Sequence, residues 1–218
     1  IETLPLHIEC FDNSNISGDD AVAACIVFRK GKPSKKEYRK YNIKTVTGPD
    51  DYASMKEVVR RRYTRMINED TPLPNLIIAD GGKGQMEVIR EVVEDELNLE
   101  IPIAGLAKNE HHKTNELLFG FPQMSIGLRL DSALFHMLTH IQDEVHRFAI
   151  TFHRDKRSKR QTASELDTIT GIGPKTKELL LKEFKSLTRI KKATLEELQK
   201  CIGESKGNTL ITYLNRQK

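Results

Sequence analysis

The sequence has no tryptophan, few aromatic residues and only three cysteines, and each shortage narrows the possible functions. Aromatic residues make up 6% of the 218 residues, so no surface for stacking on nucleic-acid bases is evident. Cys10, Cys25 and Cys201 have no C-x-x-C spacing, which argues against a disulfide scaffold or a zinc knuckle and favours a reducing cytoplasm. No apolar run approaches the roughly 18 residues of a membrane span, which excludes a membrane protein.

The chain also lacks an initiating methionine and a leader peptide. It begins at Ile1, followed by Glu2, with no basic and then apolar segment. We therefore expect a fragment of a longer protein. The length predicts one large domain, or a medium domain and a small one.

Charge is distributed unevenly along the chain, although the net charge is only +4. Residues 154–218 contain 16 Lys and Arg against 8 Asp and Glu, and residues 1–153 contain 19 against 23. A basic second part and a slightly acidic first part suggest one module that holds a polyanion and another that acts on it.

Hydrophobic periodicity predicts strands and helices in the first part and only helices in the second. Strands are expected at residues 6–11, 21–28, 36–43, 76–79 and 103–107, with a hairpin through residues 117–119 and 124–126. Helices are expected at about residues 50–69 and 83–97, and Ser132 caps a long helix that precedes the charged residues 154–160. This order resembles the ribonuclease-H-like fold, an α/β fold whose mixed sheet begins with three antiparallel strands. Four or five short helices are expected within residues 163–218.

Acidic residues fall where this fold would bring them together. Asp12 and Asp80 lie at the ends of two predicted strands, and Asp51 lies in the first turn of a helix. Neighbouring strand ends form the ligand crevice of an open α/β sheet, and two close carboxylates repel each other unless a cation lies between them. Oxygen ligands favour Mg²⁺ or Mn²⁺, which suggests phosphodiester cleavage. The alternative for each acid is the cap of a helix or a turn.

Two other candidates have equally simple structural explanations. Lys83 lies in the turn D-G-G-K-G-Q at residues 80–85, which would either contact a phosphate or serve only as a tight turn. His146 lies at the border of an apolar helical stripe, where it would be a general base, a metal ligand or a structural residue. His136 and His140, four residues apart, are interpreted as structural.

Short motifs over nearly the whole chain resemble the C-terminal half of the bacterial UvrC family. They are ECFD at 9–12, YNI at 41–43, GPDDY at 48–52, RRRY at 60–63, DGGKGQ at 80–85, HIQDEVHRFAI at 140–150 and HR at 153–154. The resemblance implies a ribonuclease-H-like endonuclease domain over residues 1–155, a basic linker over 156–162 and an all-α tandem helix-hairpin-helix domain over 163–218. It further implies the 5′ incision beside a DNA lesion in nucleotide excision repair.

The resemblance also implies roles for particular residues. Asp12 and Asp80 would bind Mg²⁺ or Mn²⁺, and His146 would be both the third metal ligand and the third member of a catalytic triad. Asp51 matches a further acid that the family needs for incision. The resemblance leaves open whether the site holds one ion or two. It also leaves open whether Asp51 contacts the metal directly.

Two glycine turns in the second part are candidate duplex contacts. The first, GIGPK at residues 171–175, has the apolar frame of a helix-hairpin-helix motif, so that Gly171, Gly173, Lys175 and Lys177 would hold phosphates without reading bases. The second turn has Glu204 where an apolar residue is usual. Its Gly203, Lys206 and Gly207 would therefore either contact DNA or pack against the first hairpin.

Further DNA contacts are predicted in the first domain, at Lys83, Lys108, Arg60, Arg61 and Arg62, with solvated helix charge as the alternative for the arginines. The implied partners are lesion-containing duplex DNA and the UvrB–DNA pre-incision complex, reached through a region upstream of this chain. We expect a cytoplasmic, nucleoid-associated monomer. The rival interpretation is a non-catalytic DNA-binding adaptor whose carboxylates are structural.

Overall fold

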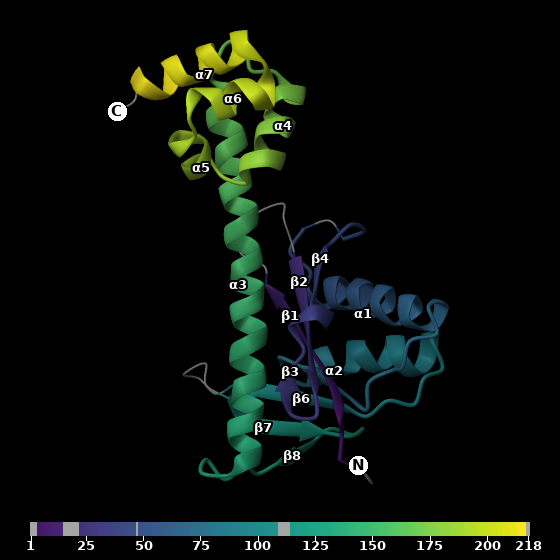
Figure 1. Cartoon of the computed structure of the whole chain (residues 1–218). Coiled ribbons are helices and arrows are strands. Elements are labelled where there is room, and N and C mark those ends of the chain that lie inside the picture. Colours follow the sequence, from purple (N-terminus) through teal and green to yellow (C-terminus); the bar gives the residue numbers. More distant parts are fainter. Residues whose placement is uncertain (1–3, 15–21, 47, 109–113, 217–218) are drawn as a thin grey trace. The chain divides into compact units, whose positions relative to one another are not determined.

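The structure, a computed structural model, describes residues 4–14, 22–46, 48–108 and 114–216 (Figure 1). Contacts divide the chain into two compact units, residues 1–152 and 153–218. Among the described residues, no helix combines the length and the apolar character that crossing a membrane requires.

The first unit is built on a mixed sheet of eight described strands. They are β1 (His7–Ser14), β2 (Val22–Arg29), β3 (Lys32–Pro33), β4 (Arg39–Asn42), β5 (Leu76–Ala79), β6 (Ile103–Lys108), β7 (Thr114–Phe119) and β8 (Met124–Ile126). Their order is β3-β2-β1-β5-β6-β7-β8, and β4 also pairs with β2. Strand β2 pairs antiparallel with β1 and with β4, whereas β5 pairs parallel with β1 and with β6. The predicted mixed sheet with an antiparallel beginning is confirmed.

In the structure the predicted third strand, residues 36–43, is reduced to β4, and the short strand β3 lies before it. A short 3-10 helix (Lys35–Glu37) separates β3 from β4. Glu37 stabilises this turn, because its carboxylate accepts hydrogen bonds from Arg29 at 2.7 Å and from Ser34 at 2.5 Å. Both strands still pair with β2, so the antiparallel order is unchanged.

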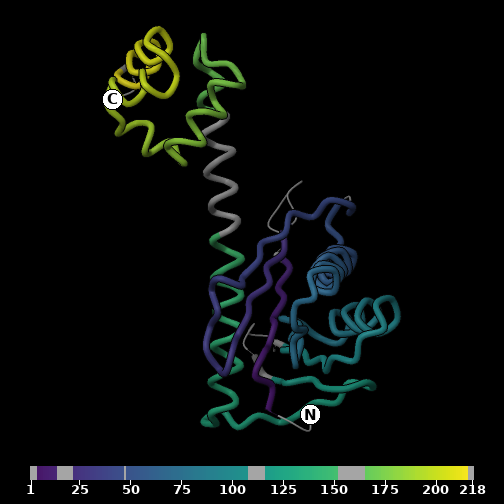
Figure 2. Tube along the Cα trace, turned by 45° about the vertical axis from the view of Figure 1, so that its right-hand side comes forward, coloured from purple at the N-terminus to yellow at the C-terminus, as the bar shows by residue number. Residues whose placement is uncertain are grey.

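Helices cover both faces of the sheet (Figures 1 and 2). Helices α1 (Asp51–Asn68) and α2 (Lys83–Arg90), the latter continued by a π-helical segment (Glu91–Glu96), pack on one face. Helix α3 (Ala133–Asp167) packs its Leu138, Ile141 and Val145 on the other face. Successive side chains of a strand point to opposite faces of the sheet, so β1 contributes residues to the hydrophobic cores on both faces.

Helix α3 begins as predicted and ends later than predicted. The hydroxyl of Ser132 accepts a hydrogen bond from the backbone nitrogen of Phe135 at 3.1 Å, which caps the helix. Its helical backbone then continues through residues 156–162, which were expected to form a linker. The segment contains no glycine or proline, and its many lysines and arginines favour helix. Loss of the apolar stripe therefore marks the end of packing on the sheet and not the end of the helix.

The second unit is helical, as predicted. It contains the end of α3, followed by α4 (Pro174–Phe184), α5 (Leu187–Lys192), α6 (Leu195–Ile202) and α7 (Glu204–Arg216). Its own core includes Leu166, Ile172, Leu180, Leu198 and Leu210. Glycines with φ of +92° at 171 and +85° at 203 form the turns before α4 and α7, because larger residues rarely adopt this backbone conformation.

Candidate active site

Two parallel strands bring Asp12 and Asp80 side by side in the middle of the sheet. Asp12 is the sixth residue of β1, and Asp80 directly follows β5. Phe11 lies opposite Ala79 in the strand register, and both face the core under α1 and α2. Because side chains alternate, the next pair of residues, Asp12 and Asp80, faces the side that α3 covers.

The imidazole of His146, on α3, contacts both carboxylates. Its Nδ1 lies 2.9 Å from Oδ2 of Asp12, and its Nε2 lies 3.1 Å from Oδ2 of Asp80. One ligand atom from each of the three residues lies within 4.8 Å of the others. The Asp80 side chain is fully buried, whereas the His146 side chain is 37% exposed. The structure thus brings together the three residues that the resemblance to the UvrC family named.

A fourth residue of this cluster, Gln142, was not found from the sequence. It lies on α3 one turn before His146 and is 6% exposed. Its Nε2 donates a hydrogen bond to Oδ1 of Asp80 at 2.5 Å. The available signal was its spacing of four residues from His146, which places both side chains on one helix face.

The donor atoms of the cluster fit a divalent cation. Two buried carboxylates this close repel each other, and a cation between them offsets that repulsion. Asp12 and Asp80 offer the hard oxygen ligands that such a cation takes, and His146 offers a nitrogen. The three side chains already converge, so each would hold the cation through one atom.

The beginning of α1 assigns different roles to the neighbouring Asp50 and Asp51. Asp50 is the N-cap, because its carboxylate accepts a hydrogen bond from the backbone nitrogen of Ala53 at 2.9 Å. Asp51 is the first residue of the helix and is exposed. Its backbone oxygen accepts a hydrogen bond of 2.6 Å from Nδ2 of Asn13, which ties α1 to β1. Capping by the side chain therefore explains Asp50, and the same hydrogen bond is not what holds Asp51 at this position.

A pocket of about 590 Å³ adjoins the cluster. It is lined by residues 49–52 and 80–85, which include Asp51, Lys83 and Asp80, so that Asp80 belongs to both pocket and cluster. Lys83 is the exposed first residue of α2, and the N-cap Gly82 provides no side-chain hydrogen bond. Positive charge at a helix beginning favours an anion there. Lys108 ends β6, but its side chain lies outside the described part of the structure.

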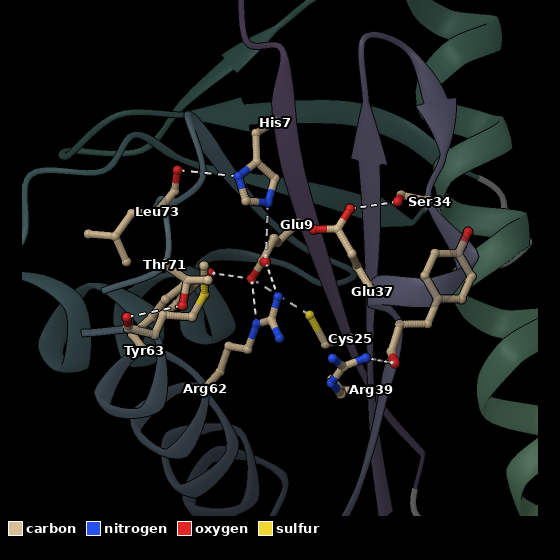
Figure 3. A network of polar contacts seen from close by, with 12 residues as sticks. His7, Glu9, Cys25, Ser34, Glu37, Arg39, Arg62, Tyr63, Thr71 and Leu73 are labelled. Carbon is tan, nitrogen blue, oxygen red and sulfur yellow. Dashed lines mark hydrogen bonds and ion pairs between the residues drawn. The ribbon is translucent and has the colours of Figure 1, made fainter. Parts of the chain in front are cut away.

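Arg62 belongs to the core of the first unit. Its guanidinium donates two hydrogen bonds to the fully buried carboxylate of Glu9, on β1, and the Nε–Oε2 distance is 3.1 Å (Figure 3). Tyr63 and His7 contact the same carboxylate at 3.2 and 3.3 Å. Burial raises the pKa of Glu9, but hydrogen bonds from His7 and Arg62 outweigh burial and lower this pKa below its ordinary value. Both predictions for Arg62, a DNA contact or a solvated charge, are wrong because the residue is buried.

Arg60 and Arg61 remain at the surface, with partners inside the first unit. Arg60 pairs with Glu96 at 2.6 Å, and Arg61 pairs with Glu57 at 2.7 Å. Their contact with DNA stays a prediction.

The first hairpin of the second unit presents most of its predicted contacts at the surface. Gly171, Gly173 and Lys175 are exposed. Lys177 instead forms an ion pair with Asp167, and only 15% of its side chain is exposed. Of the two lysines, Lys175 is therefore more accessible to a phosphate.

The second hairpin makes a contact with the first. Nζ of Lys206 donates a hydrogen bond to Oγ1 of Thr176 at 3.0 Å. Gly207 is buried inside α7, where an added Cβ would lie 3.0 Å from the backbone of Gln199 in α6. The contact of Lys206 supports packing against the first hairpin, whereas Gly207 packs within the second hairpin and Gly203 is exposed in its turn.

Comparison with known proteins agrees with this geometry. Residues 1–150 match the model of the UvrC RNase H endonuclease domain, and residues 163–216 match a SAM-like helix-hairpin-helix tandem. The chain belongs to the UvrC family. The family resemblance inferred from the motifs, and the fold class it implied, are therefore confirmed.

Curated UvrC relatives are closely similar along almost the whole chain. UvrABC system protein C of Bacteroides thetaiotaomicron is 74% identical over 98% of this chain and 35% of its own length. The proteins of Bacteroides fragilis and Streptococcus thermophilus are 70% and 59% identical, over 96% and 97% of this chain and 34% and 36% of their own. The chain thus spans about a third of the length of these UvrC proteins. Endonuclease V of Ciona intestinalis, solved with DNA, is 14% identical over 50% of this chain and 51% of its own, with a TM-score of 0.36.

Proposed function

We propose that this chain is a divalent-metal-dependent DNA endonuclease that makes the 5′ incision beside a lesion in bacterial nucleotide excision repair. One observation carries the proposal: Asp12, Asp80 and His146 offer ligand atoms within 4.8 Å of one another inside a UvrC RNase H endonuclease domain. A capping role explains neither carboxylate, because both contact His146 and neither begins a helix.

Each residue has a defined part in this proposal. Asp12 and Asp80 would hold Mg²⁺ or Mn²⁺ through carboxylate oxygens, and His146 would supply the third ligand. The ion, when bound, activates a water molecule and stabilises the charge that develops on the scissile phosphate. Lys83 attracts the phosphates of the incised strand into the pocket beside Asp80, and Asp51 acts from the lining of the same pocket. Water adds to phosphorus and the bond to the 3′ oxygen breaks, which leaves a 3′-hydroxyl and a 5′-phosphate.

The second unit holds the duplex in this proposal. Residues 163–218 form the DNA-binding domain, residues 1–155 form the nuclease domain, and the basic residues 156–162 of α3 connect them. Exposed backbone amides near Gly171 and Gly173, together with Lys175, contact phosphate oxygens without reading bases. Gly203 is the candidate contact in the second hairpin.

Selection of damaged DNA is assigned to partners. The aromatic content is low, and we propose that the UvrB–DNA complex recruits the nuclease through parts of the protein upstream of this chain. We further propose that the chain acts as a monomer on chromosomal DNA in the cytoplasm.

Nicking of supercoiled plasmid by this chain, with Mn²⁺ or Mg²⁺, tests the proposal. Wild type should nick only with metal, and Asp12→Asn and His146→Ala should be slower by at least about a hundredfold. Asp131→Asn is the control, because that exposed residue pairs with Arg129 and is not among the three residues of the cluster. Equal nicking by Asp12→Asn would refute the site. Binding of DNA without any nicking by wild type would favour the adaptor.

A further inference from the structure

We infer that Gln142 is a positioning residue that orients the Asp80 carboxylate and thereby strengthens the binding of the divalent cation. The inference rests on the proposed metal-dependent function. This glutamine is not among the motif residues given a role, and it contacts the cluster through Asp80.

The contact has a clear direction. An ionised carboxylate only accepts hydrogen bonds, so the atom of Gln142 that faces Oδ1 of Asp80 at 2.5 Å is its amide nitrogen. Counted over the whole residue, main chain included, Gln142 is 6% exposed and Asp80 is 5% exposed. Water therefore has little access to replace this donor.

Contacts of both the main chain and the side chain fix Asp80. Its backbone nitrogen donates to the carbonyl oxygen of Phe11 at 2.9 Å, which holds the main chain. Gln142 holds Oδ1, and Oδ2 lies 3.1 Å from His146. Because Oδ1 is occupied, the carboxylate keeps Oδ2 directed toward the ligand atoms of Asp12 and His146.

The position of Gln142 on α3 also links the two sides of the cluster. Gln142 and His146 are four residues apart and lie on the same helix face. The helix backbone thus sets the distance between the donor to Oδ1 and the imidazole that faces Oδ2. Outer partners of this kind orient metal ligands, and their loss usually weakens metal affinity about 10- to 100-fold.

The binding of Mn²⁺ to the whole chain, followed by the electron paramagnetic resonance signal of free Mn²⁺, tests the inference. We expect Gln142→Leu to bind Mn²⁺ at least about tenfold more weakly than wild type. If the leucine variant does not fold, Gln142→Met takes its place, because methionine has nearly the shape of glutamine. The methionine variant should also bind Mn²⁺ at least about tenfold more weakly than wild type. Asp143→Asn is the matched control, because its side chain is exposed on the next position of α3. Circular dichroism should show the same helix content in all variants.

Plasmid nicking at increasing Mn²⁺ gives a second readout. The half-saturating Mn²⁺ concentration of Gln142→Leu should rise at least about tenfold, while high Mn²⁺ restores most of the wild-type rate. Asp80→Asn should not be restored. Wild-type Mn²⁺ affinity in both Gln142 variants would overturn the inference alone. Failure of the wild-type chain to bind Mn²⁺ would overturn the proposed function and this inference together.

Discussion

The backbone nitrogen of Asp80 donates a 2.9 Å hydrogen bond to the carbonyl oxygen of Phe11, the residue before Asp12. This bond continues the parallel pairing of β1 and β5 one step beyond the end of β5. The main chain therefore sets the separation of the Asp12 and Asp80 side chains before any contact between them forms. A site built on two central strands is rigid, which suits a cluster that must hold a cation.

The two aspartates at the beginning of α1 should separate stability from catalysis. Asp50→Ala removes the N-cap bond to Ala53 and should lower the free energy of unfolding by about 1 kcal/mol, with plasmid nicking nearly unchanged. Asp51→Asn should slow nicking at least about tenfold without changing the thermal midpoint. Thermal unfolding and nicking of both variants check this. The opposite pattern would mean that Asp51 acts only on helix stability.

The buried pair of Arg62 and Glu9 should be far more important for stability than its surface neighbour. Arg62→Ala leaves the Glu9 carboxylate buried without its main partner, which should cost about 3–5 kcal/mol. Arg60→Ala removes only a partly exposed pair with Glu96 and should cost less than about 1 kcal/mol. Urea unfolding of both variants measures the difference. Similar losses of unfolding free energy in the two variants would show that the hydrogen bonds to Glu9 add little to stability.

Glu57 should make the first unit sensitive to acid. Burial raises its pKa, but hydrogen bonds from Thr45, Lys44 and Arg61 outweigh burial and lower it to about 2. A lowered pKa in the folded state stabilises the protein above the ordinary value of 4.5 and loses that stabilisation as the pH falls toward 2. Glu57→Gln should therefore be less stable than wild type near neutral pH, and the difference should shrink below 4.5. Unfolding midpoints across this range provide the check, and a constant difference would contradict the assigned pKa.

The two lysines of the first hairpin should differ in their effect on DNA binding. Lys175→Ala removes an exposed charge and should weaken binding to any duplex sequence, with the slope of log affinity against log salt reduced by about one. Lys177→Ala should change the slope less, because Lys177 is paired with Asp167. Fluorescence anisotropy with duplex DNA at several salt concentrations measures both slopes. Equal reductions would place Lys177 at the phosphate as well.

Much of the fold was predictable because its local signals agree with the tertiary structure. The apolar run at 76–79 is β5, and helix α1 begins within one residue of its predicted start at about residue 50. The charged residues 156–162 were wrongly interpreted as a linker, because α3 continues there without an apolar stripe. The third predicted strand is shorter than expected because Glu37, at its beginning, binds Arg29 and Ser34 across a turn, which no periodicity reveals.

The candidate site was predictable where fold order and motif agree, and less so elsewhere. The strand order together with the positions of the acids predicted Asp12 beside Asp80, whereas His146 needed the family resemblance because a single histidine on a helix is usually structural. Gln142 was missed because no strand order points to its hydrogen bond with Asp80, which forms between α3 and the end of β5. Burial of Arg62 was missed for the same reason, since its hydrogen bonds with Glu9 form between α1 and β1.

The most direct test of the central claim is a crystal structure of this chain grown with Mn²⁺, examined by anomalous diffraction. The claim predicts a manganese peak that contacts Asp12, Asp80 and His146, with oxygen ligands at about 2.1 Å. The same crystals of Asp80→Asn should show the peak lost or strongly reduced. A manganese peak elsewhere, or none while Asp12 and Asp80 contact only His146, would contradict the claim.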